Sequence, residues 1–387
     1  MIVKSLVLKN FRNYSGLEFQ PAPGLSVLFG PNGAGKTNIL EALVVLALTR
    51  SNRASRDEEL ATMGQSGYYL RASLERAAAG GGATGRAEVS WEKGRRKQFK
   101  YNGAILPSAA DLVGHLLLVF FGPDELQIAK GPPNQRRRYL DVILSQISPA
   151  YLHSLTQYNR ILSQRNKLLR EGQGKVLDRA LLSVWDEQLV EAGSSLTARR
   201  SAATVRLGAA AATVHSDLAG AKEHLSVIYD PSVLRDSGRA PENAPAASLE
   251  ALREAFSGRL DRLRAAEMAR GVSLVGPHRD DLILNLDGVD LRNYGSQGQT
   301  RTAALALKFA ELSFLRQETG EEPLMLLDDV LSELDEDRRK ALAGLLEDGR
   351  RQALVTTTDA TLLPPAVAAQ ASYFRVGGGE VVPLREV

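Results

Sequence analysis

The sequence predicts a mixed α/β fold that is split by a helical insertion. Near the N-terminus, the apolar run of residues 25–29 leads directly into a glycine-rich loop, and a helical pattern follows it. Strand-like segments fill residues 68–106, and similar segments return after residue 280. Because helical spacing dominates the region between them, we expect one interrupted α/β domain, and no repeat of fixed period is present.

The composition limits the possible classes of protein. The 387 residues are 44% hydrophobic, which suits an ordinary soluble globular chain with two domains or one domain and an insertion. The net charge is only +3, a weak indication of nucleic acid, and the lack of cysteine excludes disulfides, zinc fingers and a thiol nucleophile. Apolar runs such as residues 116–121 are shorter than the roughly 20 residues that span a bilayer, so we expect no membrane partner and a cytoplasmic location.

The N-terminal elements follow from their periodicity. Residues 2–8 alternate as in a strand, residues 25–29 form a buried strand, and residues 39–46 show helical spacing. The segments within 68–106, separated by a glycine-rich stretch and a YNG turn, predict an antiparallel sheet appended to this core.

The middle of the chain predicts an antiparallel helical hairpin or short coiled coil. Two apolar stripes support it, and Arg165 fills a gap in the first; the stripes are Tyr151, Leu155, Tyr158, Leu162 and Leu169, then Leu182, Trp185, Leu189, Ala192 and Leu196. A polar connector, residues 236–248, precedes a third helix from residue 249 to about 269. A hairpin over 282–291 and strands within 324–330 and 353–359 complete the pattern.

The stretch GPNGAGKTN matches the phosphate-binding pattern G-x-x-x-x-G-K-[ST] and has the required strand before it and helix after it. Loop N–H groups and the helix N-terminus suit an anion, Lys36 suits the β and γ phosphates, and the Thr37 hydroxyl suits Mg²⁺. The alternative is a glycine-rich turn with a chance lysine. The predicted ATP-binding residues are Gly30, Pro31, Asn32, Gly33, Ala34, Gly35, Lys36, Thr37 and Asn38, with Lys36 also catalytic.

Two acids follow the apolar run of residues 324–327 and complete the predicted site. Asp328 is expected to join Thr37 in the Mg²⁺ shell, and Asp329 to orient or deprotonate the attacking water. Alternatively, acids after a strand cap the next helix, which Ser332 and Asp335 would do equally well.

Residues 294–312, YGSQGQTRTAALALKFAEL, resemble the signature segment of ABC-type ATPases. Other segments are similar to the RecF family of bacterial recombination mediators over residues 8–359: LKNFRNY, FFGPDEL, the arginine triplet before YLD, SLVGPHRDDL and SELD. The lack of a several-hundred-residue coiled coil separates the chain from SMC proteins. Without these resemblances, GSQGQT would be an ordinary helix start.

The resemblance implies an ABC-type P-loop ATPase head with an antiparallel β subdomain and a helical insertion that contains a short coiled-coil-like hairpin. The implied domains are 1–127 (N-terminal part of the head, with the P-loop and β subdomain), 128–270 (insertion) and 271–387 (C-terminal part of the head). It places Ser296, Gln297, Gly298 and Gln299 on the γ-phosphate of a partner subunit. It also carries over Arg12 as a phosphate contact, Asp335 as the D-loop acid, Gln127 as the Q-loop glutamine and Thr357 as the γ-phosphate sensor. Gln127 lies later than a usual Q-loop glutamine, and Thr357 stands where transporter cassettes have histidine.

The implied function is an ATP-dependent homodimer that binds DNA and helps load recombinase at single-strand gaps with RecO and RecR, during replication-linked repair and the SOS response to DNA damage. Weak, DNA-stimulated hydrolysis would reset this clamp. Alternatives are an ABC cassette driving a transporter and a small-molecule P-loop kinase. An ATP-dependent dimer with DNA-stimulated hydrolysis would favour the clamp.

Basic clusters are the candidate DNA contacts, through phosphates rather than bases. They are Arg95, Arg96 and Lys97 in a hairpin, Arg136, Arg137 and Arg138, and the pair Arg199 and Arg200. A solvated charged face is an equal alternative for each cluster. We interpret His278 as a structural, hydrogen-bonding histidine rather than a ligand.

Overall fold

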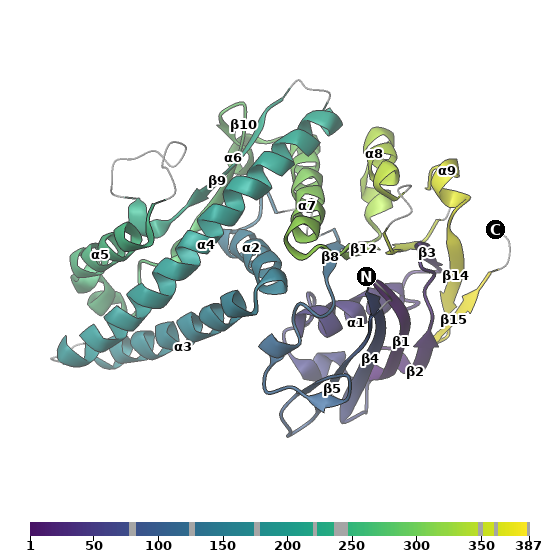
Figure 1. Ribbon diagram of the computed structural model, residues 1–387, viewed down its shortest axis with the longest axis horizontal. Coiled ribbons are helices and arrows are strands. Elements are labelled where there is room, and N and C mark those ends of the chain that lie inside the picture. The colour runs from purple at the N-terminus through teal and green to yellow at the C-terminus, as the bar shows by residue number, and fades with distance from the viewer. Residues whose placement is uncertain are drawn as a thin grey trace. The chain divides into compact units, whose positions relative to one another are not determined.

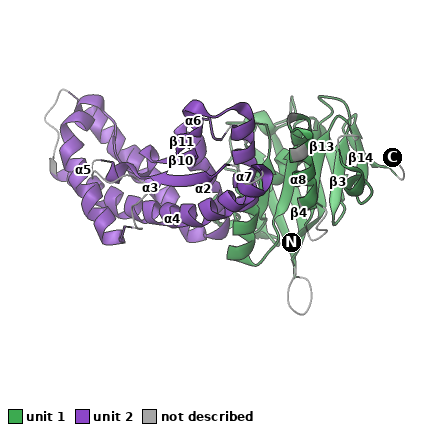
Figure 2. Cartoon of the chain, turned by 90° about the horizontal axis from the view of Figure 1, so that it is seen from above, with its two compact units in different colours: residues 1–127, 311–387 green, residues 128–310 purple. Residues whose placement is uncertain are grey.

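The computed structural model describes residues 1–76, 83–123, 128–173, 179–219, 223–235, 247–346, 351–359 and 363–384. Contacts divide the chain into two compact units, Met1–Gln127 with Glu311–Val387 (unit 1) and Ile128–Ala310 (unit 2) (Figure 2). The first boundary between the units lies at residue 127, where the sequence analysis ended the N-terminal part of the head. The second falls at residue 310 rather than at 270, because the strand Asp281–Leu286 pairs with Leu225–Asp230 of the insertion.

A parallel sheet in unit 1 brings together both ends of the chain. Its strand order is β15-β14-β3-β13-β12-β8, and the strands are β3 (Leu25–Phe29), β8 (Leu118–Phe121), β12 (Leu324–Asp328), β13 (Ala353–Thr357), β14 (Ser372–Gly377) and β15 (Glu380–Pro383). All are parallel except the edge strand β15. β12 and β13 are buried along their whole length, which explains why they read as continuous apolar runs.

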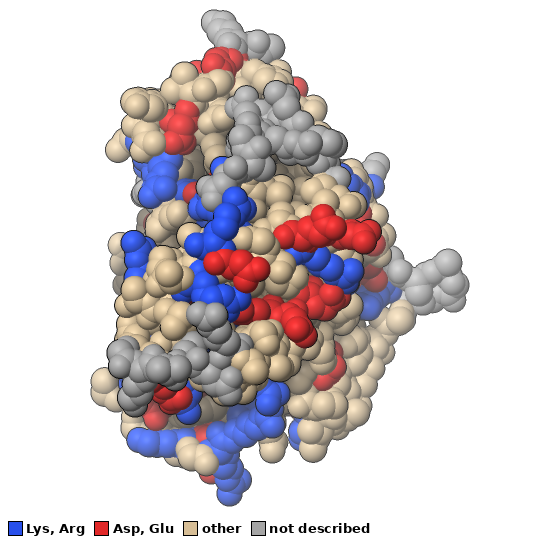
Figure 3. Space-filling model, turned by 90° about the vertical axis from the view of Figure 1, so that its left-hand side faces the viewer, with Lys and Arg blue, Asp and Glu red and all other residues tan. Residues whose placement is uncertain are grey.

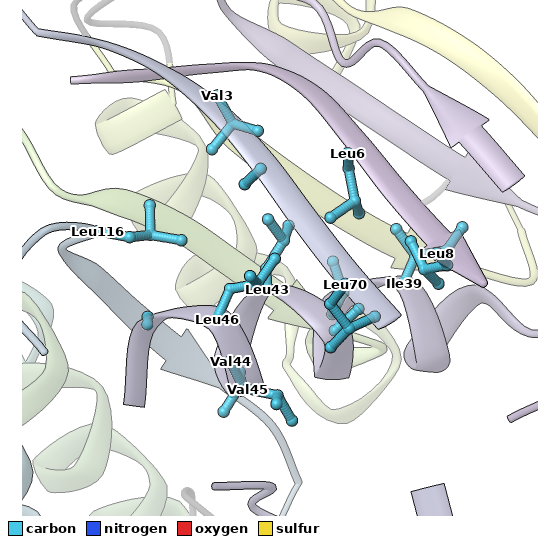
Figure 4. Close-up of a cluster of buried hydrophobic side chains, with 14 of the residues drawn as sticks. Val3, Leu6, Leu8, Ile39, Leu43, Val44, Val45, Leu46, Leu70 and Leu116 are labelled. Atoms are coloured by element: carbon cyan, nitrogen blue, oxygen red, sulfur yellow. The ribbon is translucent and has the colours of Figure 1, made fainter. Parts of the chain in front are cut away.

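An antiparallel sheet forms the predicted β subdomain of unit 1. Its strand order is β2-β1-β4-β5-β6-β7, and the strands are β1 (Ile2–Phe11), β2 (Tyr14–Phe19), β4 (Gly67–Arg76), β5 (Ala83–Glu92), β6 (Gln98–Tyr101) and β7 (Ala104–Ile105). Buried and part-exposed residues alternate along β4, as expected when one face of a sheet covers a core. Val3, Leu6 and Leu8 of β1 join Ile39 and Leu43 of the helix after β3 in that core (Figure 4).

In the described part of unit 1, the longer helices are α1 (Lys36–Leu48) and α8 (Glu336–Leu346). The short helical segments are η1 (Asp57–Leu60), η2 (Ala109–Asp111), η7 (Val330–Glu333) and α9 (Pro365–Ala368). The helix α7 (Gln297–Thr319) runs across the boundary between the units. Among the described residues, no helix is long and apolar enough to cross a membrane.

Unit 2 contains the predicted helical insertion (Figure 1). Its elements are α2 (Pro133–Ile147), α3 (Pro149–Glu171), α4 (Arg179–Ala219), β9 (Leu225–Asp230), η4 (Ser232–Leu234), α5 (Leu249–Arg270), η6 (Pro277–Arg279), β10 (Asp281–Leu286), β11 (Val289–Asp290) and α6 (Leu291–Tyr294). The predicted hairpin is α3 with α4, which lie side by side over part of their length. The predicted strand pair over 282–291 is β10 with β11.

Arg165 interrupts the apolar stripe of α3 because it is the centre of a buried ionic cluster. Its side chain is fully buried, and its nitrogen atoms lie 2.6 Å from Asp186 Oδ1 of α4 and 2.6 Å from Glu267 Oε2 of α5. It also donates to Ser273 Oγ at 2.7 Å. One guanidinium therefore connects three helices of unit 2, and its planar shape suits several fixed acceptors better than a lysine would.

Replacing Arg165 with methionine is expected to lower the free energy of unfolding by about 3–5 kcal/mol, because Glu267 would stay buried without its cation and Asp186 would keep only its pair with Arg264. Arg160→Met, at an exposed position of the same helix, should change it by less than about 0.5 kcal/mol. Denaturant unfolding of both variants checks this. Equal stability of the two variants would contradict a structural role for the buried cluster.

Candidate nucleotide-binding site

The predicted phosphate loop connects β3 to α1 and requires glycine at two positions. Gly35 caps α1 with φ 107°, and a Cβ there would lie 2.5 Å from Asn13 Nδ2 and 2.7 Å from Tyr14 Oη. At Gly30, a Cβ would lie 2.3 Å from Val376 O. Side chains at these positions would clash or strain the backbone, so the glycines let the loop pack closely and turn into the helix N-terminus.

Lys36 folds back over this loop. Its Nζ donates to Gly30 O at 2.7 Å and to Pro31 O at 3.0 Å. Burial lowers the pKa of Lys36, and the nearby charges of Asp329 and Asp328 act in the opposite direction. The loop therefore holds a cation whose present acceptors are neutral carbonyl groups, and phosphate oxygens would be stronger acceptors for it.

Thr37 and Asp328 meet at the carboxyl ends of β3 and β12. Thr37 Oγ1 donates to Asp328 Oδ1 at 2.7 Å, although the residues are 291 positions apart. Two oxygens bound to one Mg²⁺ in an octahedral shell lie about 2.9 Å apart, so this pair fits the predicted metal. The described residues contain no group of three or more acidic, histidine or cysteine side chains that could hold a metal ion, and Mg²⁺ bound mostly by phosphates and water needs none.

Asp329 directly precedes η7 and has a left-handed conformation with φ 52°. Its amide donates to Thr356 O at 3.2 Å and to Thr356 Oγ1 at 3.0 Å, and Ser332 Oγ donates to its carbonyl at 2.7 Å. The second acid thus lies next to the first on a locally ordered turn. Whether it acts on a water molecule stays a prediction.

Three other residues of unit 1 have roles assigned by resemblance, and the structure describes two of them. Thr357 Oγ1 donates to Asp359 O and accepts from Asp359 N, so its hydroxyl is engaged in a turn. Asp335 caps α8 by accepting from Arg338 N at 3.0 Å, as the capping alternative expected. Gln127 lies outside the described residues. Roles for these three residues in catalysis stay predictions.

Arg12 lies at the end of β1 and is held by a residue that sequence analysis missed. Its Nε and Nη2 donate to the two carboxylate oxygens of Glu41 at 2.8 and 2.7 Å, and Nη1 donates to Glu59 O. Glu41 is buried in α1, and it is the lone acid of that helix and lies within its apolar part, which was an overlooked signal. A contact between Arg12 and ATP stays a prediction.

Asn13 was also missed, and it connects the β1–β2 turn to the phosphate loop. Its Nδ2 donates to Ala34 O at 3.2 Å, and its Oδ1 accepts from Asn38 Nδ2 at 2.8 Å. The side chain therefore supports both the loop and the first turn of α1. No motif in the sequence indicated this contact.

The signature residues form the N-terminus of α7 in unit 2. Ser296 Oγ accepts from Gln299 N at 3.1 Å, and Gln299 Oε1 accepts from Ser296 N at 3.0 Å, which makes a capping box. Gln299 Nε2 also donates to Glu223 Oε1 at 2.8 Å. Gln297 and Gly298 open the helix beside them. The arrangement gives an ordered helix N-terminus, as an anion site requires.

The structure corrects part of the predicted DNA surface. Arg136 is buried, and its guanidinium pairs with Asp281 at 2.8 Å, so it is not available to a phosphate. Arg200 is buried against Asp141, and Lys97 lies 2.5 Å from Asp57. Arg137 is half-buried and donates to Asp280 O. Arginines and lysines are mostly exposed unless paired, and here distant acids supply the partners.

Arg95, Arg96 and Arg138 remain exposed, as does Arg199. Arg95 forms a surface pair with Glu92 at 2.9 Å and keeps 75% of its side chain exposed. The face drawn in Figure 3 carries basic and acidic side chains interspersed. DNA contact by the exposed arginines therefore stays a prediction.

His278 has the structural role that was expected. Its Nε2 lies 3.2 Å from Ser273 O, a carbonyl that can only accept, so Nε2 carries the proton and Nδ1 accepts from Tyr158 at 2.6 Å. Burial lowers the pKa of His278 to about 4. The ring is therefore neutral at pH 7 and held on both sides.

The parallel sheet, the loop after β3 and the acids after β12 define a P-loop nucleotide-binding head. A family profile described as RecF/RecN/SMC N terminal domain matches residues 2–375. The chain is 46% identical to the DNA replication and repair protein RecF of Symbiobacterium thermophilum, covering 99% of this chain and 98% of that one. Its identity to the protein of the same name from Heliobacterium modesticaldum is 41%, covering 98% and 99%. The chain belongs to the RecF family.

Solved structures agree with this assignment. The recombination mediator protein RecF-ATP in the RecFOR pathway matches with a TM-score of 0.89 and 32% identity, covering 99% of this chain and 97% of that one. An Smc head domain from Pyrococcus furiosus matches at a TM-score of 0.54 and 15% identity, covering 99% and 96%, which shows the fold alone. The predicted fold class, an ABC-type head with a β subdomain and a helical insertion, is confirmed.

Proposed function

We propose that this chain is an ATP-dependent DNA-binding protein of recombinational repair. It dimerises on ATP, helps load recombinase at single-strand gaps or junctions with RecO and RecR, and resets by slow hydrolysis in the cytoplasm. The observation that carries the proposal is the meeting of Thr37 and Asp328 at 2.7 Å beside the phosphate loop. Full-length relatives named for DNA replication and repair favour this role over the transporter cassette.

Each residue of the site has a task in the proposed mechanism. The loop N–H groups and Lys36 bind the β and γ phosphates of ATP, while Thr37 and Asp328 hold Mg²⁺, which supplies charge neutralisation when bound. Asp329 orients the attacking water. An aspartate is one methylene shorter than the glutamate that many related ATPases use, which supports slow turnover. Ser296 and Gly298 of a second subunit close the site from the opposite side.

Sedimentation velocity with and without ATP and gapped DNA tests the proposal. The clamp should dimerise with ATP, bind the DNA in that form, and hydrolyse ATP faster when DNA is present. A chain that stays monomeric with ATP and hydrolyses it at the same rate with and without DNA would contradict the proposal.

DNA affinity should fall steeply with salt and vary little with base sequence, since the exposed arginines suit phosphate contacts. The double variant Arg95→Glu, Arg96→Glu should weaken binding about tenfold or more and lower the salt slope by about two, while ATP binding is kept. Lys97 is left unchanged because it pairs with Asp57. Fluorescence anisotropy over a salt series measures both quantities.

Glu92→Gln is the matched control, because it removes the charge partner of Arg95 without reversing any basic residue. It should bind DNA at least as tightly as the unmodified chain. Equal salt slopes for the double variant and the unmodified chain would exclude this hairpin from the DNA surface.

A further inference from the structure

The end of β13 lies between the two halves of the nucleotide site in unit 1. β13 pairs on one side with β3, which leads to the phosphate loop, and on the other with β12, which leads to the two acids. The register sets Thr356 opposite Leu28 of β3 and opposite Asp328 of β12. Ligands of open parallel sheets bind at the carboxyl ends of strands, so Thr356 is at the level of the chemistry.

The hydroxyl of Thr356 contacts the carboxylate of Asp328 and the backbone amide of Asp329 at once. It is buried, donates to Asp328 Oδ1 at 2.8 Å, and accepts from the amide of Asp329 at 3.0 Å. A hydroxyl has one proton and two lone pairs, and a carboxylate is a stronger acceptor than the carbonyl of Leu327, which lies farther away at 3.5 Å. The direction of both hydrogen bonds is therefore determined.

Two hydroxyls converge on the same carboxylate oxygen. Thr37 donates to Asp328 Oδ1 from the phosphate loop, and Thr356 donates to it from β13. A metal that binds Thr37 Oγ1 would use the lone pairs of that hydroxyl, whereas the bond from Thr356 does not conflict with metal binding. Thr356 can thus orient the carboxylate before and after the metal arrives.

The same hydroxyl supports the residue that carries the second acid. Asp329 has φ 52°, a left-handed conformation that few residues other than glycine adopt, although aspartate and asparagine do so more often than the rest. Its amide is held by Thr356 Oγ1 and Thr356 O, so β13 fixes the peptide from which the Asp329 side chain projects. A left-handed conformation at a residue with a side chain persists where the surrounding hydrogen bonds hold it.

We propose that Thr356 is a positioning residue for ATP hydrolysis. Through a single hydroxyl it orients the metal-binding oxygen of Asp328 and the backbone of Asp329 together. This inference rests on the proposed ATPase function. The neighbouring Thr357, assigned by resemblance as the γ-phosphate sensor, has its hydroxyl engaged with Asp359 instead and offers a matched comparison.

The experiment compares Thr356→Val, which removes the hydroxyl and keeps the shape, with Thr356→Ser and Thr357→Val. Hydrogen exchange of the peptide containing the Asp329 amide, measured without nucleotide or metal, should be about tenfold faster in Thr356→Val. The kcat for ATP should fall about tenfold and the Mg²⁺ concentration for half-maximal rate should rise, with KM for ATP within about twofold. Thr356→Ser should restore the exchange rate, the kcat and the Mg²⁺ dependence. Thr357→Val should leave the exchange of the Asp329 peptide unchanged.

Unchanged exchange and turnover in Thr356→Val, or equal effects of the two valine variants on exchange of the Asp329 peptide, would overturn the inference. If the unmodified chain does not hydrolyse ATP, the proposed function fails, but the exchange comparison still decides whether Thr356 positions the two acids. Thermal unfolding of each variant separates these results from a loss of fold.

Discussion

Lys36→Ala is expected to weaken ATP binding by at least about a hundredfold. Lys36 is the cation of the phosphate loop, and a hydrogen bond between charged groups contributes about 1.5–3 kcal/mol, so losing two of them to phosphate oxygens has this effect. The fold should tolerate the change, because the present partners of Nζ, Gly30 O and Pro31 O, lie in a part-exposed loop. Isothermal titration calorimetry with ATP and Mg²⁺ measures the affinity.

Lys4→Ala is the matched control. Lys4 lies in the same unit, is 54% exposed and pairs on the surface with Glu75, so its removal should leave ATP affinity within about twofold. An affinity for ATP that is equal in the Lys36 and Lys4 variants would remove the phosphate-loop assignment, and with it the ATPase proposal.

Ser296→Arg is expected to abolish ATP-driven dimerisation while leaving ATP binding by the monomer nearly intact. In the proposed clamp, Ser296 contacts the γ-phosphate held by the partner subunit, and a long side chain would block that approach. The change also removes the cap that Ser296 Oγ gives to Gln299 N, at a cost of about 1 kcal/mol of stability. Sedimentation with ATP measures the dimer, and calorimetry measures the binding.

Mixing the Ser296→Arg and Lys36→Ala proteins tests the arrangement across subunits. In a mixed dimer, one of the two composite sites combines an unmodified phosphate loop with an unmodified signature, so partial recovery of hydrolysis is expected. Ser163→Arg, which puts the same charge on an exposed position of α3, should dimerise normally. Normal dimerisation of Ser296→Arg would show that the signature assignment is wrong.

Much of the nucleotide site could be predicted from the sequence because its chemistry is local. A glycine-rich loop between a strand and a helix uses residues adjacent in the chain, and Lys36 and Thr37 follow from the motif. The acids could be placed because a buried apolar strand leads directly to them. Thr356 and Thr357 could not be separated in this way, since only strand register decides which hydroxyl faces Asp328.

By itself, the sequence determined the strand, phosphate loop and helix of residues 25–48, the helical character of the middle of the chain and the return of strands after it, because periodicity and glycine positions reflect local backbone preferences. Only the tertiary structure decided which basic residues are buried. Arg136 meets Asp281 across 145 positions, and Arg165 meets Glu267 across 102, so a cluster that reads as a charged surface contains buried ion pairs. A buried charge requires a partner, and the chain fold alone determines whether one is present.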